Sequence, residues 1–151
     1  MGYFSAVSKS HILMEFSVYL MFNGNCEEAM NFYQNALGAE QVSMQRYGES
    51  PMPAADGEWK EKILHCGIQK DGFLIMASDS RDKNGGIATG NNVQISINLH
   101  SEEEVNSVFA NISAGGTVTM ELQDTFWGAR FGMCTDKFGV SWMFNYDRPQ
   151  K

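Results

Sequence analysis

Polar and apolar side chains alternate along residues 93–99, which places three uncharged hydrogen-bonding groups on one side of a predicted strand. One face carries Gln94, Ser96 and Asn98, and the other carries only valine, isoleucine and leucine. Successive side chains of a strand point to opposite sides of the sheet. If the apolar face packs on helices, the polar face lines a cavity that suits an uncharged or zwitterionic organic ligand. The alternative is the solvated face of a half-open antiparallel sheet.

Two large rings and a cation lie close together in residues 124–132, among glycines. Phe126 and Trp127 could close over a bound molecule, and the guanidinium of Arg130 suits a carboxylate or phosphonate. Two alternatives stay open. Trp127 is also a typical core or dimer-interface residue, and Arg130 could pair with Asp124 or Asp136 instead of a ligand.

One histidine and two methionines complete the predicted ligand-binding set. His65 lies in a predicted strand, where it is either a hydrogen-bonded core group or a functional one. Strand parity places Met76 and Met143 on the inward face. The residues expected beside them are Leu20, Ser78, Ser141 and Asn145.

Composition excludes several classes of function. The chain has 151 residues and a formal net charge of −7, which argues against sequence-independent nucleic-acid binding and against anionic membranes. Its three cysteines form no Cys-x-x-Cys pair, so neither a disulfide framework nor a zinc knuckle is predicted. A reducing, cytoplasmic location is expected. Residues 1–15 contain no apolar run long enough for a signal core or a membrane span, and they are predicted to form a flexible arm.

The first half predicts one strand, one helix and three further strands, over residues 16–80. The expected strands cover residues 16–22, 41–47, 62–69 and 73–78. The helix follows Asn25, its expected N-cap, and ends at Gly38. Residues 48–59 hold two of the three prolines and are predicted to be a loop.

The second half repeats this order over residues 92–147, after a linker at 81–91. The expected strands cover residues 93–99, 117–122, 129–135 and 140–146. Ser101 is the expected N-cap of the second helix, and Gly139 supplies a turn before the last strand. Two such modules would share one core and form one compact unit.

Several motifs resemble a known superfamily. They are the opening Tyr19–Ala29 with Phe32-Tyr33 and Leu37-Gly38 behind it, and the run Asp124–Gly132. Together with the paired modules, they are similar to the vicinal oxygen chelate superfamily of glyoxalases, extradiol dioxygenases, fosfomycin-resistance and bleomycin-binding proteins. Residues 125–130 and 136–140 look like its PhnB-like branch, often labelled demethylubiquinone methyltransferase-like. The resemblance implies an α+β, glyoxalase-like fold, in which two βαβββ modules form a curved mixed sheet of eight strands.

The resemblance also implies a divalent metal held by His, Gln or Glu from four strands. The matching positions here are Val18, Met76, Gln94 and Met143, of which only Gln94 offers a ligand. Another register could bring in His65. Hard cations need several oxygen or nitrogen donors, so no metal and no cofactor are predicted.

These observations favour a metal-independent small-molecule-binding protein with its ligand in the concave cup of the sheet. One alternative is an enzyme, either a metal-dependent lyase, dioxygenase or thiol transferase, or a metal-free catalyst using His65 or Arg130. Another is a structural or regulatory dimer without a ligand. A homodimer is expected because modules of this kind leave sheet edges unpaired.

Overall fold

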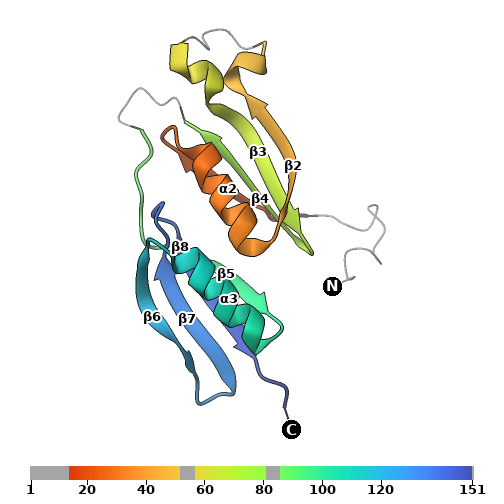
Figure 1. The fold of residues 1–151 in the computed structure, drawn as a ribbon, viewed down its shortest axis with the longest axis vertical. Helices are drawn as coiled ribbons and strands as arrows, with labels where there is room; N and C mark the ends of the chain where they lie inside the picture. Colours follow the sequence, from red (N-terminus) through yellow and green to blue (C-terminus); the bar gives the residue numbers. More distant parts are fainter. Residues whose placement is uncertain (1–13, 52–56, 81–85, 151) are drawn as a thin grey trace. The chain divides into compact units, whose positions relative to one another are not determined.

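The computed structural model describes residues 14–51, 57–80 and 86–150. The chain folds as two compact units that divide between Ile87 and Ala88, here called module 1 and module 2. Each has the order strand, helix, three strands (Figure 1). The predicted α+β fold of two βαβββ modules is confirmed, and the eight strands are hydrogen-bonded as two four-stranded mixed sheets.

Module 1 contains one helix and four strands in the sheet order β1-β4-β3-β2. β1 is parallel to β4, and the other pairs are antiparallel. Its elements are β1 (Val18–Phe22), α2 (Cys26–Leu37), β2 (Glu40–Arg46), β3 (Ile63–Lys70) and β4 (Phe73–Asp79).

Module 2 repeats this scheme in the order β5-β8-β7-β6, with β5 parallel to β8. Its elements are β5 (Ile95–Leu99), α3 (Glu102–Ser113), β6 (Thr117–Asp124), β7 (Ala129–Thr135) and β8 (Ser141–Asp147). In both modules the helix lies across one face of its own sheet (Figure 1). We call this the covered face and the other the open face.

The covered faces hold the cores. In module 1 the Cys26 and Cys66 sulfurs lie 3.7 Å apart, which joins the start of α2 to β3. In module 2 the Phe109 ring of α3 packs edge-on against Phe144 of β8, with centroids 5.2 Å apart. Trp142 stacks beside Phe144 and is fully buried. These aromatic contacts form the core of module 2.

Two buried carboxylates fix the helix start and the last turn. Asp79 accepts hydrogen bonds from the amides of Gly24, Cys26 and Ile63 at 2.9 Å each. Asn25 occupies the predicted N-cap position of α2, but its side chain makes no capping hydrogen bond, and Asp79 accepts from the Cys26 amide at the helix start instead. Ser101 does cap α3, because its hydroxyl accepts from the Glu104 amide at 3.0 Å.

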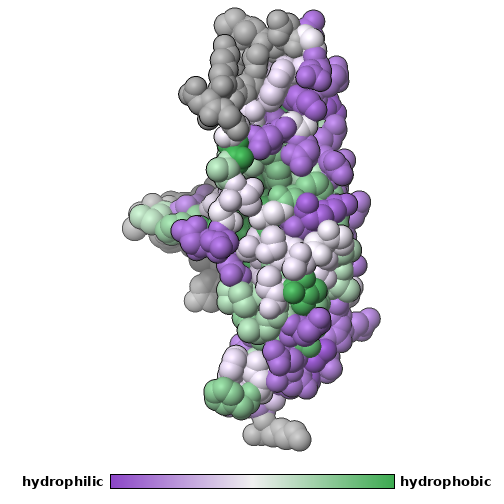
Figure 2. All heavy atoms as spheres, turned by 90° about the vertical axis from the view of Figure 1, so that its left-hand side faces the viewer, coloured by the Kyte–Doolittle hydropathy of each residue, from purple (hydrophilic) through white to green (hydrophobic). Residues whose placement is uncertain are grey.

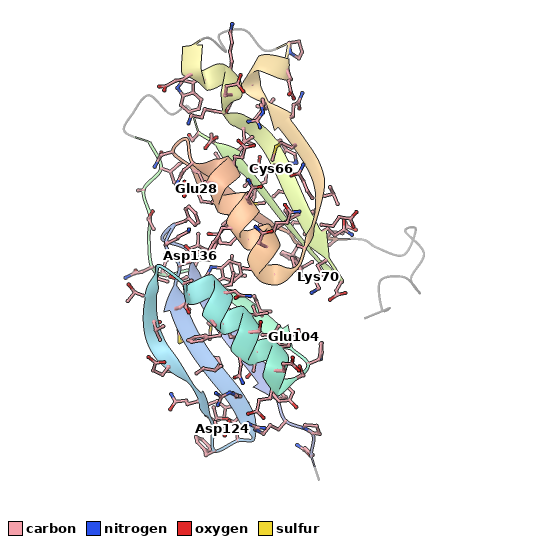
Figure 3. All side chains as sticks on the ribbon, viewed as in Figure 1. Glu28, Cys66, Lys70, Glu104, Asp124 and Asp136 are labelled. Carbon is pink, nitrogen blue, oxygen red and sulfur yellow. The ribbon has the colours of Figure 1, made fainter. Side chains whose placement is uncertain are left out.

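Asp136 is the buried carboxylate of module 2, and it holds the turn between β7 and β8. It accepts from the amides of Phe138 and Val140 at 2.8 and 3.0 Å and from the Trp142 indole at 2.8 Å. Gly139 has a φ of 89°, as expected for the turn residue. Figure 3 shows Asp136 where β7 passes into β8, and Cys66 on β3.

Some predicted boundaries are wrong by a few residues. The strand expected from residue 16 begins at Val18, and the strand expected from residue 93 begins at Ile95. The loop predicted at 48–59 contains parts of two short 3-10 helices, Tyr47–Glu49 and Gly57–Glu61. Most of the predicted arm at 1–15 and part of the linker at 81–91 lie outside the described residues.

Candidate ligand-binding surfaces

The open face of module 1 carries thioethers, a hydroxyl, an imidazole and a phenol. Strand pairing sets this face: Tyr19 lies opposite Met76, Met21 lies opposite Ser78, and Met76 lies opposite Gly67. His65 on β3 shares the face, because its neighbour Cys66 points to the helix. The predicted pair His65 and Met76 therefore lies on one face of one sheet.

Tyr19 and His65 contact each other across this surface. The tyrosine hydroxyl lies 3.3 Å from His65 Nδ1, and the ring centroids are 5.8 Å apart. Tyr19 is 45% exposed, so the pair is open to a ligand. Sequence analysis missed Tyr19 because it placed the inward positions of the first strand at Val18 and Leu20.

That placement is wrong by one residue. Val18 pairs with Ile75 and Leu20 with Ala77, and both partners are buried on the covered face. A shift of one position moves every side chain of a strand to the other side of its sheet. The parity of Met76, combined with a parallel β1–β4 pair, would have identified Tyr19.

The open face of module 2 carries hydroxyls, amides and thioethers. Ser96 lies opposite Met143, and Asn98 lies opposite Asn145. The Asn145 amide donates to Asn98 Oδ1 at 3.2 Å and to Asp147 Oδ1 at 3.1 Å. The predicted residues Ser96, Asn98 and Met143 therefore share this face. Gln94 is exposed and lies one residue before β5, with the same parity.

Phe126 and Trp127 occupy the turn between β6 and β7. The turn is closed by Thr125, whose Oγ1 accepts from the Ala129 amide at 3.0 Å and donates to the Ala129 carbonyl at 3.2 Å. Gly128 has a φ of 89°, which favours glycine at this position. The two rings meet edge to face with centroids 4.9 Å apart, and Phe126 is 98% exposed. Their role as a rim over a ligand stays a prediction.

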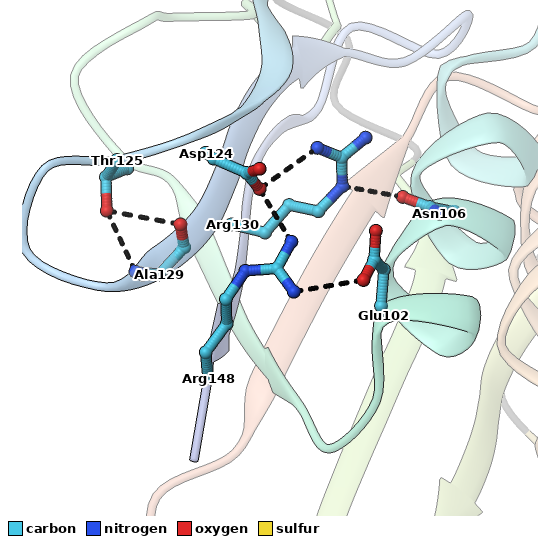
Figure 4. A network of polar contacts seen from close by, with 7 residues as sticks. All are labelled: Glu102, Asn106, Asp124, Thr125, Ala129, Arg130 and Arg148. Atoms are coloured by element: carbon cyan, nitrogen blue, oxygen red, sulfur yellow. Dashed lines mark hydrogen bonds and ion pairs between the residues drawn. The ribbon is translucent and has the colours of Figure 1, made fainter. Parts of the chain in front are cut away.

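Arg130 lies apart from the other predicted residues, on the covered face of module 2. Its Nε donates to Asn106 Oδ1 of α3 at 2.8 Å, and its Nη1 lies 3.3 Å from Asp124 Oδ1 (Figure 4). Arg148 contacts the same Asp124 at 2.8 Å and Glu102 at 3.0 Å. These cations, Arg148 first, hold the pKa of Asp124 below its usual range. This network favours the structural alternative for Arg130.

The cysteines are not positioned for nucleophilic chemistry. The hydrogen bond with Cys66, together with burial, raises the pKa of the Cys26 thiol. Burial raises the pKa of the Cys134 thiol to about 12. Thiols with raised pKa values are poor nucleophiles. The hydrogen bond with Cys26 lowers the pKa of the Cys66 thiol, but Cys66 is only 1% exposed and is therefore closed to a substrate.

A pocket of about 270 Å³ lies in module 1 away from the open face. Three of its polar side chains already have partners: Glu27 is paired with Arg46, Lys62 donates to the Gly24 carbonyl, and Asp79 accepts from three amides. On the face drawn in Figure 2, strongly hydrophobic residues show as small separate areas among hydrophilic ones. Of the helices in residues 14–51, 57–80 and 86–150, none is long and apolar enough to cross a bilayer.

The comparisons with known proteins agree with this architecture. The family model described as Glyoxalase/Bleomycin resistance protein/Dioxygenase superfamily matches residues 11–144. The chain belongs to this superfamily. Protein YjdN of Escherichia coli strain K12 is 36% identical over 146 residues, which cover 91% of this chain and 98% of that protein. The superfamily resemblance predicted from the sequence is confirmed.

Two solved structures are also similar to this superfamily member. Protein PA1353 from Pseudomonas aeruginosa is 39% identical with a TM-score of 0.80, and the match covers 90% of this chain and 99% of that one. A putative 3-demethylubiquinone-9 3-methyltransferase, PhnB protein, from Bacillus cereus is 28% identical with a TM-score of 0.72, over 88% and 99% of the two chains. The second structure carries the name of the predicted PhnB-like branch.

The divalent metal that the superfamily resemblance implies does not fit the donors found here. The register places Tyr19, rather than Val18, opposite Met76, and it places Ser96, rather than Gln94, opposite Met143. Two thioethers, a phenol and an alcohol are poor ligands for a hard divalent ion. Within the described part of the chain, no three His, Cys, Asp or Glu side chains gather where they could hold a metal ion.

Proposed function

We infer that the protein binds a small organic molecule on the open faces of its sheets without a divalent metal ion. One observation carries this inference: these faces present flexible thioethers beside neutral hydrogen-bonding groups. Met76 and Met143 stand where metal ligands are expected, and Ser96 adjoins Met143. Thioethers adapt to irregular apolar surfaces, and amides and hydroxyls orient a ligand through hydrogen bonds.

The same groups define the ligand class. In module 2 the neutral amides of Asn98 and Asn145 both donate and accept. In module 1 the Tyr19–His65 pair offers an aromatic surface with a polar edge. An uncharged or zwitterionic molecule with an aromatic or aliphatic body suits this set. A strongly anionic ligand does not, because the cations Arg130 and Arg148 are already paired with carboxylates.

The methionines provide the experiment. We would label their methyl groups with ¹³C and screen a library of neutral and zwitterionic compounds by NMR in the presence of a chelator. A ligand should shift the methyl signal of the open face that it occupies, which is Met76 in module 1 or Met143 in module 2. The signal of Met30, a residue of α2 that is 2% exposed, should not move. Equal changes at Met30 and at the open-face methionines would contradict a surface-specific site.

A matched pair of variants tests a hit. Ser96→Ala removes a hydroxyl from the open face of module 2, and Ser107→Ala removes an exposed one from α3. Loss of one ligand hydrogen bond costs about 1 kcal/mol, or about fivefold in affinity. We expect Ser96→Ala to weaken binding by that amount and Ser107→Ala to leave it unchanged.

The Tyr19–His65 contact supports a second candidate, a metal-free catalyst. A histidine oriented by a phenol can transfer protons at neutral pH. Turnover of a hit, lost in His65→Gln and retained in Ser107→Ala, would favour this candidate. Binding without turnover would favour the binding protein.

We also propose that the protein is a homodimer. In each sheet the two outermost strands have a hydrogen-bonded neighbour on one side only within their own module, and such edges are commonly covered by another copy. Light scattering at micromolar concentration checks this proposal, and a monomer mass would contradict it. The acidic charge balance supports the further expectation that neither nucleic acid nor membrane is a partner.

A further inference from the structure

Three methionines form a row across the open face of module 2. Met120 of β6 lies opposite Met133 of β7, and Met133 lies opposite Met143 of β8. Ser96 of β5 continues the row beside Met143. Residues that are directly opposite each other in a sheet point to the same side. The β6–β7 register shifts on both sides of Met120, but Met120 and Met133 are themselves paired, so the row places three thioethers on one face, on three adjacent strands.

These sulfurs can converge on one point. Neighbouring strands lie about 4.8 Å apart, and a methionine side chain has three rotatable bonds. Met120 and Met143 flank Met133 and can lean toward it from both sides. Met120 is 39% exposed, so the row is open to solutes at its β6 end.

Module 1 offers no comparable row within its described strands. There Met21 lies opposite Ser78, Met76 lies opposite Tyr19 and Gly67, and Met44 lies opposite Cys66. Met21 is nevertheless 43% exposed, close to the value for Met120. Both modules thus have an exposed methionine, but among the described strands only those of module 2 place methionines directly opposite one another.

The donor set selects a soft cation. Thioethers are neutral and soft, and they favour ions such as Cu(I) over Mg²⁺, Ca²⁺ or Mn²⁺. They need no deprotonation, so binding does not require the release of a proton. The chain's net charge of −7 also favours a cation over an anion. The properties that make this surface unsuitable for a hard divalent ion are the ones that suit a soft monovalent one.

We propose that Met120, Met133 and Met143 form a binding site for a soft monovalent d¹⁰ cation, Cu(I). The three thioether sulfurs are its ligands, with Met133 at the centre of the row. This site goes beyond the proposed function, because organic ligands and hard metals play no part in it. Failure of the ion to bind would leave the organic-ligand proposal intact.

Silver nitrate serves as the probe, because Ag(I) has the charge and softness of Cu(I) and is not oxidised by air. The ¹³C-labelled methionine methyl signals are followed by NMR during the titration. We expect those of Met120, Met133 and Met143 to shift together and saturate, while those of Met21 and Met30 stay in place. Shifts spread evenly over the observed methionines, or no shift in the row, would overturn the proposal.

Two methionine-to-leucine variants, which nearly conserve side-chain volume, make the test more specific. Met133→Leu removes the central sulfur and should abolish the saturable shifts of Met120 and Met143. Met21→Leu removes a methionine of similar exposure that is outside the row, and should leave them intact. Should Met133→Leu fail to fold, the more exposed Met120→Leu takes its place. Unchanged Ag(I) binding in Met133→Leu, or in Met120→Leu where it takes its place, would overturn the proposed site.

Thiols also bind soft metals, so Cys134 needs its own control. It lies next to Met133 on β7, but its partner in the sheet is the buried Trp142 of the covered face. Cys134→Ala should therefore retain the methionine shifts. Loss of these shifts in Cys134→Ala, together with normal binding in Met133→Leu, would assign the ion to the thiol and overturn the proposal.

Discussion

Module 1 and module 2 share their topology and their covered faces, and they differ in the chemistry of their open faces. Each places a buried carboxylate, Asp79 or Asp136, where three donors converge. The open face of module 1 carries an imidazole in contact with a phenol, whereas that of module 2 carries an amide pair and a methionine row. Packing constrains the covered face, and the open face is free to serve function.

The largest effect is expected from the shared carboxylates. Asp79→Ala and Asp136→Ala each remove an acceptor of three hydrogen bonds, and each should lower the free energy of unfolding by about 3 kcal/mol. Urea denaturation measures this change. The exposed Glu103→Ala is the control and should stay within about 0.5 kcal/mol of the original protein. A cost below 1 kcal/mol for either aspartate would contradict its structural role.

The next largest effect is expected from substitution of two glycines, one on each kind of face. A Cβ on Gly132, on the covered face, would lie 3.0 Å from both Leu122 Cα and Phe109 Cε2. A Cβ on Gly67, on the open face, would meet first the Ser43 hydroxyl at 3.1 Å. Gly132→Ala should therefore cost about 1–3 kcal/mol by overpacking, and Gly67→Ala should cost less because a hydroxyl can rotate away. Equal thermal shifts for the two variants would count against the distinction.

Arg130→Ala tests whether Arg130 stabilises the covered face of module 2 or binds a ligand. Because Arg130 pairs with the largely exposed Asp124, the expected loss of stability is small, and it should decrease as salt is added. Binding of any open-face ligand should be unchanged, as judged by the methionine methyl signals. Loss of ligand binding without loss of stability would return Arg130 to the ligand site.

The smallest effect concerns an ion pair of module 1 and its pH dependence. The Arg46 guanidinium lies 2.5 Å from Glu27 and lowers the pKa of that carboxyl below its ordinary value of 4.5. A lowered folded pKa means that the pair stabilises the protein above pH 4.5 and that this contribution is lost as pH falls through the folded pKa. Both side chains are partly exposed, so the contribution should be about 0.5 kcal/mol.

Urea midpoints measured between neutral and acidic pH check this expectation. The difference in stability between Glu27→Gln and the original protein should become smaller as the pH falls below 4.5. Glu28→Gln, on the exposed neighbouring residue, is the matched control. A Glu27→Gln difference that does not change with pH would show that the ion pair contributes nothing.

The covered faces were the predictable part of the fold. Alternation along β5 and β8, helix periodicity, and the Ser101 cap follow from local rules, and the structure agrees with them. The cap of α2 was not predictable in this way, because its acceptor is Asp79, more than 50 residues away along the chain.

The candidate site was only partly predictable. Alternation along single strands was enough to place Ser96, Asn98, Met76 and Met143 on the open faces. The other residues depend on how the strands pair. Tyr19 was missed because a first strand with apolar residues at every position gives no alternation to fix its faces. Arg130 depends on Asn106 of α3, a contact that sequence spacing does not reveal.

The central claim is that an organic ligand binds the open faces without a divalent metal. It is tested most directly by calorimetric titration of one screened ligand into protein treated with chelator, and again after addition of zinc, manganese, nickel or iron(II). We predict the same affinity in every titration, and the methyl shift of Met76 or Met143, whichever the ligand contacts, should not depend on the metal. Binding that disappears in chelator and returns with one equivalent of a divalent metal would contradict the account.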